Sequence, residues 1–177
     1  MASRLAAVYA RTASASSLAE ETWLETRAHG PIRTRGHFIR AEVERRRIDD
    51  DVRILDAEPW LVIPLREAPN LDREGGDIVF VDDKLWTVEK ALENGAGQLK
   101  LMLQEPQYMA ATVEGVPIEI VFAGHEDSLV DAAVAIVESG VALAPGDVID
   151  LKNGGDWTVT GVAPWKPGYR RVTLAAA

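Results

Sequence analysis

The sequence predicts a mainly β fold in which one small sandwich or barrel module occurs twice in tandem, preceded by an N-terminal α-helical segment. Three observations lead to this prediction: apolar runs with a period near two, turns rich in Gly and Asp, and one ordered series of residues that occurs twice. The 177 residues suffice for two small domains. We expect an N-terminal helical or flexible arm over residues 1–30, a first β module over 31–105 and a second over 106–177.

The arm is rich in Ala, Leu and Glu. Residues 3–26 predict one weakly amphipathic helix or two shorter ones, because the Ser- and Thr-rich stretch 12–17 is a poor helix interior. Such a helix could pack on its own module or become ordered on a partner. Its apolar stretch is too short for a secretory signal, and the chain has no apolar run long enough to cross a membrane. These features predict an intracellular protein without a membrane partner.

Strand patterns begin after Gly30 and Pro31. We expect strands in the alternating segment 36–44 and in four shorter apolar segments, with a polar loop at 44–58 and turns at 82–84 and 94–97. The four shorter segments are residues 60–65, 77–81, 85–88 and 99–103. Residues 104–115 then read as a linker that leads into the second module.

The strongest internal signal is a repeat. Residues 76–88 align with residues 146–159 through a Gly-Asp pair and a Trp-Thr-Val sequence, with one extra residue in the second turn. We therefore expect 61–63 to match 135–137, 39–43 to match 118–122, and the alternating strand after Gly97 to match the one after Gly168. The markers of the repeat are Gly76, Asp77, Trp86, Gly146, Asp147 and Trp157.

The two tryptophans of the repeat are predicted to fill the cores of the modules, because a small barrel needs a large apolar side chain in its centre. The alternative, that Trp86 and Trp157 stack on nucleic-acid bases, requires basic neighbours. Asp82, Asp83 and Asp156 are acidic instead, and the net charge of −9 also argues against binding to phosphates. A core role is therefore the favoured interpretation.

Residue types that carry chemistry are sparse in the sequence. The chain has no cysteine, and its three histidines lack a second metal ligand at the spacing of common metal sites. The Gly pairs at 75–76 and 154–155 lack the helix that a phosphate-binding loop precedes. We therefore predict no enzyme activity, no metal and no cofactor.

One charged cluster stands out within residues 44–53, where three arginines precede three aspartates. Arg45, Arg46 and Arg47 are followed by Ile48 and then by Asp49, Asp50 and Asp51. Such a segment can be a solvated loop, or an interface loop in which both charge signs set the register against a neighbouring subunit. Both interpretations stay open.

Residues 1–105 resemble the lambdoid phage head-tail joining proteins, which complete the head and receive the tail. The resemblance follows the Ala-rich N-terminus with Tyr9 and Arg11, the Arg-Gly-x-Phe sequence at 35–38, the polar segment 44–58, the strand at 60–65, and the later Gly-Asp, Leu-Trp-Thr-Val and Gly97–Leu103 elements. It implies a small β-sandwich or barrel that acts as a head-tail connector, or stopper, in the neck of a virion and in the host cytoplasm during assembly.

The resemblance also implies partners. They are further copies of the chain in a ring, a hexamer in the family, together with the portal and adaptor ring and a tail-terminator or tail-tube protein, with DNA passing through without sequence-specific binding. Candidate contacts are Arg4, Tyr9, Arg11, Arg45 to Arg47 and Asp49 to Asp51. A tail-terminator or minor tail protein and a stand-alone ligand-binding β-barrel are the alternatives. The second module, which family members usually lack, stays unexplained by the resemblance.

Overall fold

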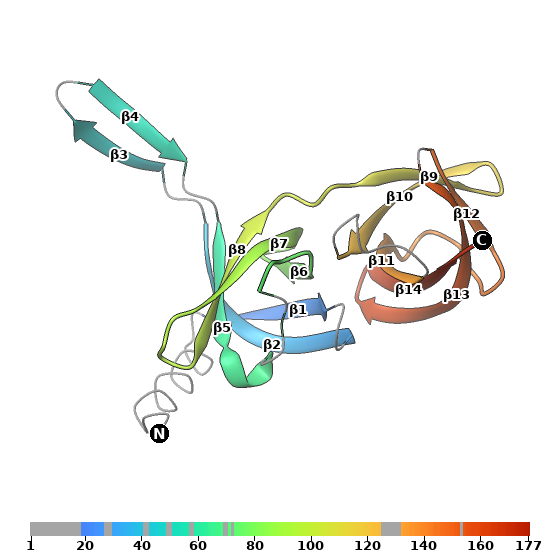
Figure 1. The fold of residues 1–177 in the computed structure, drawn as a ribbon, viewed down its shortest axis with the longest axis horizontal. Helices are drawn as coiled ribbons and strands as arrows, with labels where there is room; N and C mark the ends of the chain where they lie inside the picture. The colour runs from blue at the N-terminus through green and yellow to red at the C-terminus, as the bar shows by residue number, and fades with distance from the viewer. Residues whose placement is uncertain are drawn as a thin grey trace.

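The computed structural model describes residues 19–26, 30–40, 43–48, 51–56, 59–68, 71, 73–124, 132–152 and 154–177. Within these ranges the chain forms fourteen strands and one short 3-10 turn. Twelve of the strands build two closed six-stranded barrels, and the other two form a separate hairpin. The fold is therefore a tandem pair of barrels, as Figure 1 shows along the long axis of the molecule.

The first barrel has the strand order β1-β2-β5-β8-β7-β6, and β6 pairs back with β1 to close it. A 3-10 turn at Leu65–Glu67 follows β5. Its strands are β1 (Glu20–Thr26), β2 (Gly30–Ile39), β5 (Trp60–Pro64), β6 (Ile78–Val81), β7 (Lys84–Glu93) and β8 (Gln98–Gln104).

The second barrel has the strand order β10-β11-β14-β13-β12-β9, and β9 pairs back with β10. Read from β9, this is the same cyclic order as in the first barrel, so β1 corresponds to β9, β2 to β10 and β5 to β11. Its strands are β9 (Met109–Val113), β10 (Val116–Ala123), β11 (Ala132–Glu138), β12 (Val148–Leu151), β13 (Gly155–Lys166) and β14 (Tyr169–Ala176).

The strand registers show that the equivalence extends to single residues. Val79 lies opposite Trp86 in the first barrel, as Ile149 lies opposite Trp157 in the second. The long strand of each barrel has an irregularity at the same place, between Val88 and Lys90 in β7 and between Val159 and Gly161 in β13. A β-bulge sharpens strand curvature, so both barrels bend at the same point to close.

The Gly-Asp pairs have the same backbone role in both barrels. Gly76 donates its N–H to Val88 O at 2.7 Å, and Val88 donates to Asp77 O at 2.8 Å; Gly146, Val159 and Asp147 repeat both bonds at 2.8 Å. The two glycines have φ values of 89° and 99°, in the left-handed region that glycine adopts without strain. This corner therefore has the same geometry in both barrels.

Each barrel has its own apolar core. Trp157 is buried, and its ring centroid lies 6.0 Å from that of Phe122; in the first barrel half-buried Trp86 lies 5.7 Å from Phe38. Trp157 belongs to the core of the second barrel, whereas Trp86 packs against the core of the first and is only partly buried. The expected match of 61–63 with 135–137 is confirmed, because Leu61 and Ala135 lie opposite the equivalent residues Phe38 and Phe122.

Some expectations from the sequence are wrong. The predicted helix over 3–26 is wrong in its last seven residues, because Glu20–Thr26 forms strand β1 and closes the first barrel. Residues 1–18 of this prediction lie outside the described part of the chain. The match of 39–43 with 118–122 is shifted, since Phe38 is the residue that corresponds to Phe122. The expected linker 104–115 contains strand β9, a full member of the second barrel.

The segment 44–58 is not a loop along its whole length. Val43–Ile48 (β3) and Asp51–Asp56 (β4) pair in an antiparallel two-stranded sheet that is separate from both barrels. Figure 1 shows this hairpin extending from the first barrel, away from the second. The hairpin is inserted between β2 and β5. The equivalent connection in the second barrel, from β10 to β11, has no such strands among its described residues.

Candidate assembly surfaces

The two barrels meet through a third apolar cluster, separate from the two cores. The first barrel contributes outward-facing residues of β6 and β7, namely Ile78, Phe80 and Leu85, and the second contributes Val121, Ala123, Ile136 and Trp165. All seven are buried. Burying apolar side chains stabilises a contact by about 25 cal/mol for each Å² removed from water. The seven buried residues therefore hold the two barrels together.

An ion pair lies beside this apolar contact. Arg171 of β14 donates its Nε–H to Glu25 Oε1 of β1 at 2.8 Å, and the Glu25 side chain is fully buried while that of Arg171 is 23% exposed. Burial raises the pKa of Glu25, the hydrogen bond and charge of Arg171 oppose this rise, and the charge of Asp77 adds to it. Arg171 therefore compensates a carboxylate that would otherwise be costly to bury.

A backbone bond adds to the contact: Gly124 donates its N–H to Gly76 O at 2.7 Å. Lys166, from the second barrel, lies over the ring of Phe80 with its Nζ 2.9 Å from the ring centroid. Burial lowers the pKa of this lysine, and the charge of Asp83 opposes that shift. Apolar, ionic and cation-π contacts thus all cross the seam between the barrels.

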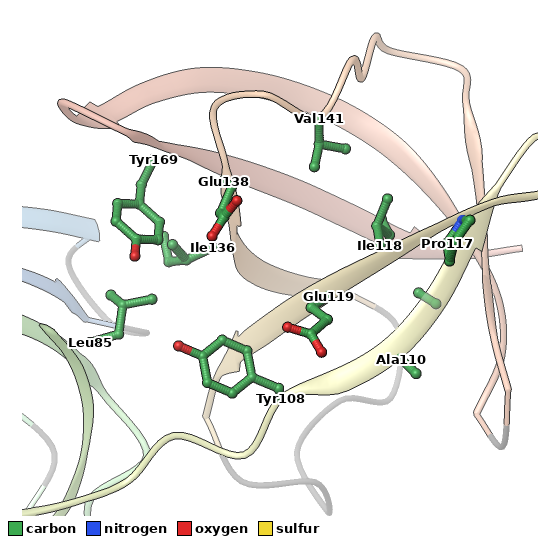
Figure 2. Close-up of a pocket in the computed structure, with 11 residues that line it drawn as sticks. Leu85, Tyr108, Ala110, Pro117, Ile118, Glu119, Ile136, Glu138, Val141 and Tyr169 are labelled. Atoms are coloured by element: carbon green, nitrogen blue, oxygen red, sulfur yellow. The ribbon is translucent and has the colours of Figure 1, made fainter.

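A pocket of about 390 Å³ opens at the same seam. Figure 2 shows two phenol rings, from Tyr108 in the connection between the barrels and Tyr169 in β14, with the carboxylates of Glu119 and Glu138 beside them. Burial raises the pKa of both tyrosines. Glu119 and Glu138 add to the rise in the pKa of Tyr108, whereas Tyr108 and Glu138 add to the rise in the pKa of Tyr169. The apolar part of the pocket is lined by Leu85, Ile136 and Val141, and the carboxylates of the two glutamates make its other side acidic.

A surface ion pair lies at the end of β2, close in sequence to the hairpin. Arg40, directly after β2, donates from Nε and Nη2 to the two carboxylate oxygens of Asp82 at 3.0 and 2.7 Å. Asp82 belongs to the β6–β7 turn and has a φ of 54°, within the left-handed region. This two-point contact ties the end of β2 to the β6–β7 turn.

Those predicted assembly contacts that the structure describes lie apart from this seam. Arg45, Arg46 and Arg47 belong to β3 and Asp51 begins β4, so the structure brings these four into one hairpin. Asp49 and Asp50, and likewise Arg4, Tyr9 and Arg11, lie outside the described residues. The predicted contacts therefore occupy the hairpin at least in part, and none of the described ones contributes to the seam.

Sequence reasoning missed the seam between the barrels. Its signal is a difference between the repeats: Phe80 and Leu85 stand where the second copy has Asp150 and Asp156. Apolar residues that occupy outward positions in just one of the two copies indicate a surface that is covered in that copy. Glu25 gave no such signal, because it was placed in a helix.

No protein-family model matches the chain, and no curated protein matches it either. Within the described ranges, no group of three or more His, Asp or Glu side chains is placed to hold a metal ion. None of the helical structure described there is long and apolar enough to cross a membrane.

Proposed function

We propose that the chain is a structural virion protein of a tailed phage or prophage, a head-tail connector or stopper that joins the portal and adaptor complex to the tail. The observation that carries the proposal is the hairpin β3–β4, which stands apart from both barrels and concentrates arginine and aspartate. An isolated two-stranded hairpin is only marginally stable in water. A partner that covers it would supply the missing stabilisation.

The register of the hairpin supports a partner of mixed charge. Arg46 lies opposite Arg53, and like charges directly across an antiparallel pair are unfavourable. Acidic groups of a neighbouring subunit would relieve this repulsion, while the three aspartates that follow Ile48 in the sequence would take basic groups. In this proposal the hairpin contacts the adaptor ring or a neighbouring copy, and Arg4, Tyr9 and Arg11 make further contacts of the same kind.

The tandem barrels would then act as a rigid spacer in the neck of the virion. The apolar seam and the Glu25–Arg171 pair fix one barrel on the other, which suits a protein that transmits position between two rings. The acidic second half carries nine acidic and four basic residues over 106–177. If that half lined a channel, like-charge repulsion would let DNA pass without sticking.

The test is disruption of the gene in the phage or prophage that encodes the chain. We expect filled heads and separate tails to accumulate, and purified protein added to such heads should restore joining. Hairpin variants Arg45→Glu and Arg47→Glu should fail to restore it, whereas the matched variant Arg66→Glu, on the surface turn after β5, should succeed. Normal joined particles from the disrupted genome would overturn the proposal. Completed, stable heads with defective tails would favour the tail-terminator role instead.

The seam pocket favours one function of a different class, a ligand-binding β-barrel. Its apolar wall, two phenols and two carboxylates suit a small cation with an apolar body. Under this alternative, Glu138→Gln should abolish binding of such a ligand without affecting head-tail joining. The connector function is preferred because the pocket explains neither the hairpin nor the tandem arrangement.

A further inference from the structure

The pocket at the seam lies where the pairing of two strands of the second barrel ends. The last directly paired residues of β10 and β11 are Val121 and Ile136. Two residues further along the same antiparallel register, Glu119 would stand opposite Glu138. Both glutamates and Ile136 line the pocket of about 390 Å³, and Figure 2 shows both carboxylates directed into it. Like charges at facing positions repel each other, so the pocket opens where two carboxylates need a counter-charge.

The equivalent place in the first barrel holds charges that already have partners. By the residue equivalence, Arg35 of β2 occupies the position of Glu119 in β10. Arg35 donates its Nη2–H to Ala19 O at 2.6 Å, and Arg33 beside it forms an ion pair with Glu21. All three charged residues of the first barrel line a pocket of their own. The first barrel therefore satisfies these groups from within the chain.

The two carboxylates of the second barrel have no such partner among the residues that the structure describes. Glu119 lies opposite Ala110, whereas Arg35 at the equivalent position lies opposite Glu21. Within the described ranges, neither Glu119 nor Glu138 forms an ion pair. A cation supplied by another molecule would provide the counter-charge that the equivalent place in the first barrel finds within the chain.

Two phenol rings and apolar side chains form the rest of the pocket. Tyr108 is 51% exposed, and Tyr169 is half-buried. Burial raises the pKa of both tyrosines, so both hydroxyls keep their protons at neutral pH, and aromatic ring faces attract cations. Leu85 of the first barrel and Val141 of the second add hydrocarbon surface. This lining suits a ligand that carries positive charge on a hydrocarbon body.

We propose that the seam pocket binds a small aliphatic diamine in its doubly protonated form. One ammonium group pairs with Glu119 and the other with Glu138, while the hydrocarbon chain lies against the apolar lining. Two carboxylates favour a dication over a single ammonium group, because each positive charge offsets one negative charge. The ligand touches both barrels, since Leu85 belongs to the first barrel and the glutamates belong to the second. This site goes beyond the connector function, and neither depends on the other.

Calorimetric titration of the full-length protein with cadaverine, an unbranched diamine, tests the site. We expect saturable binding that weakens as salt screens the charges. Glu119→Gln and Glu138→Gln should each weaken binding about tenfold, because one ammonium group then loses its carboxylate. Pentylamine, which has the same chain and a single ammonium group, should also bind about tenfold more weakly than cadaverine. Pentanol, which has no charge, should show no measurable binding.

Glu114→Gln is the matched control, because it removes an exposed carboxylate in the β9–β10 turn outside the pocket. This variant should bind cadaverine like the unaltered protein, and far-UV circular dichroism checks the fold of every variant. The proposal is overturned if millimolar cadaverine does not bind, if either pocket variant binds it normally, or if pentylamine binds equally well.

A capped tripeptide with lysine at its centre distinguishes a free diamine from a lysine side chain of a partner protein. We expect the tripeptide to bind more weakly than cadaverine, because it brings one ammonium group. Tighter binding of the tripeptide would overturn the diamine and assign the pocket to a protein partner. Head-tail joining should be normal with Glu119→Gln and Glu138→Gln, so failure of this site and failure of the connector function are distinguishable.

Discussion

The two barrels share the main features of their interiors and differ on their outer surfaces. Inside, the Gly-Asp corner, the bulge in the long strand and the Phe-Trp pair occupy equivalent positions in both. Outside, Phe80 and Leu85 of the first barrel correspond to Asp150 and Asp156 of the second. Closing a six-stranded barrel constrains the inside of both copies, whereas the outside follows what each copy contacts. The comparison thus separates residues that make the fold from residues that make the assembly.

The largest expected difference between equivalent positions concerns Arg171 and Lys100. Arg171→Ala leaves the buried carboxylate of Glu25 without its partner and should lower the free energy of unfolding by about 3–5 kcal/mol. Lys100→Ala removes a cation from a solvent-facing surface and should cost less than about 1 kcal/mol. Urea unfolding followed by tryptophan fluorescence measures both. Equal costs at the two positions would contradict the assignment of one covered and one open face.

The next contrast compares Phe80 with Asp150. Phe80→Ala removes a buried ring from the seam and should cost about 3 kcal/mol, because the transfer free energy is lost and a cavity remains. Asp150→Ala, at the equivalent exposed position, should change stability by about 0.5 kcal/mol or less. Differential scanning calorimetry would show whether Phe80→Ala also separates the melting of the two barrels. A single unchanged transition for this variant would argue against a stabilising seam.

A third contrast lies within the cores, where the copies exchange a large and a small residue. Gly36 faces Leu61 and Ile63 in the first barrel, and a Cβ at position 36 would lie 2.6 Å from Leu61 Cδ1. In the second barrel Ile120 corresponds to Gly36, and Ala135 corresponds to Leu61. Gly36→Ala should therefore cost about 1–3 kcal/mol by overpacking.

A double-mutant cycle at this site tests the exchange. Gly36→Ala combined with Leu61→Ala should be less destabilised than the sum of the single variants, because the smaller residue makes room for the added methyl group. Urea unfolding of the four proteins provides the coupling energy. If the two destabilisations simply add, the residues at positions 36 and 61 do not compete for the same space in the core.

The sequence predicted the inner features of the fold better than the outer ones. The Gly-Asp and Trp-Thr-Val series identified the duplication, and the turn residues identified the hairpin between β6 and β7, because turn geometry and period-two burial are local properties. Strand β1 was mistaken for part of a helix, since its seven residues have few turn signals and its role depends on pairing with distant β6. The seam depends on the relative placement of two barrels, so its signal, Phe80 and Leu85 against Asp150 and Asp156, appears only when the two copies are compared.

The smallest expected effect concerns pH and the buried carboxyl group of Glu25. Burial raises its pKa above the ordinary value of 4.5, so between that value and the raised one the folded protein binds more protons than the unfolded chain. The stabilising contribution of the protonated carboxyl is therefore complete below about pH 4.5 and is lost as pH rises through the folded-state pKa. Glu25→Gln cannot ionise, and the difference in stability between this variant and the unaltered protein should grow in its favour over that interval, by on the order of 1 kcal/mol.

Glu114→Gln, at an exposed position in the β9–β10 turn, is the control. It removes one carboxylate but leaves Glu25 in place. Its stability should therefore still decrease as pH rises through the pKa of Glu25, whereas Glu25→Gln should lack this decrease. Urea midpoints measured from pH 4 to pH 8 for the three proteins supply the comparison. A pH dependence for Glu25→Gln that parallels that of Glu114→Gln would mean that the carboxyl group at the seam does not gain or lose its proton in this range. The contribution of the Glu25–Arg171 pair to stability would then be independent of pH in this range.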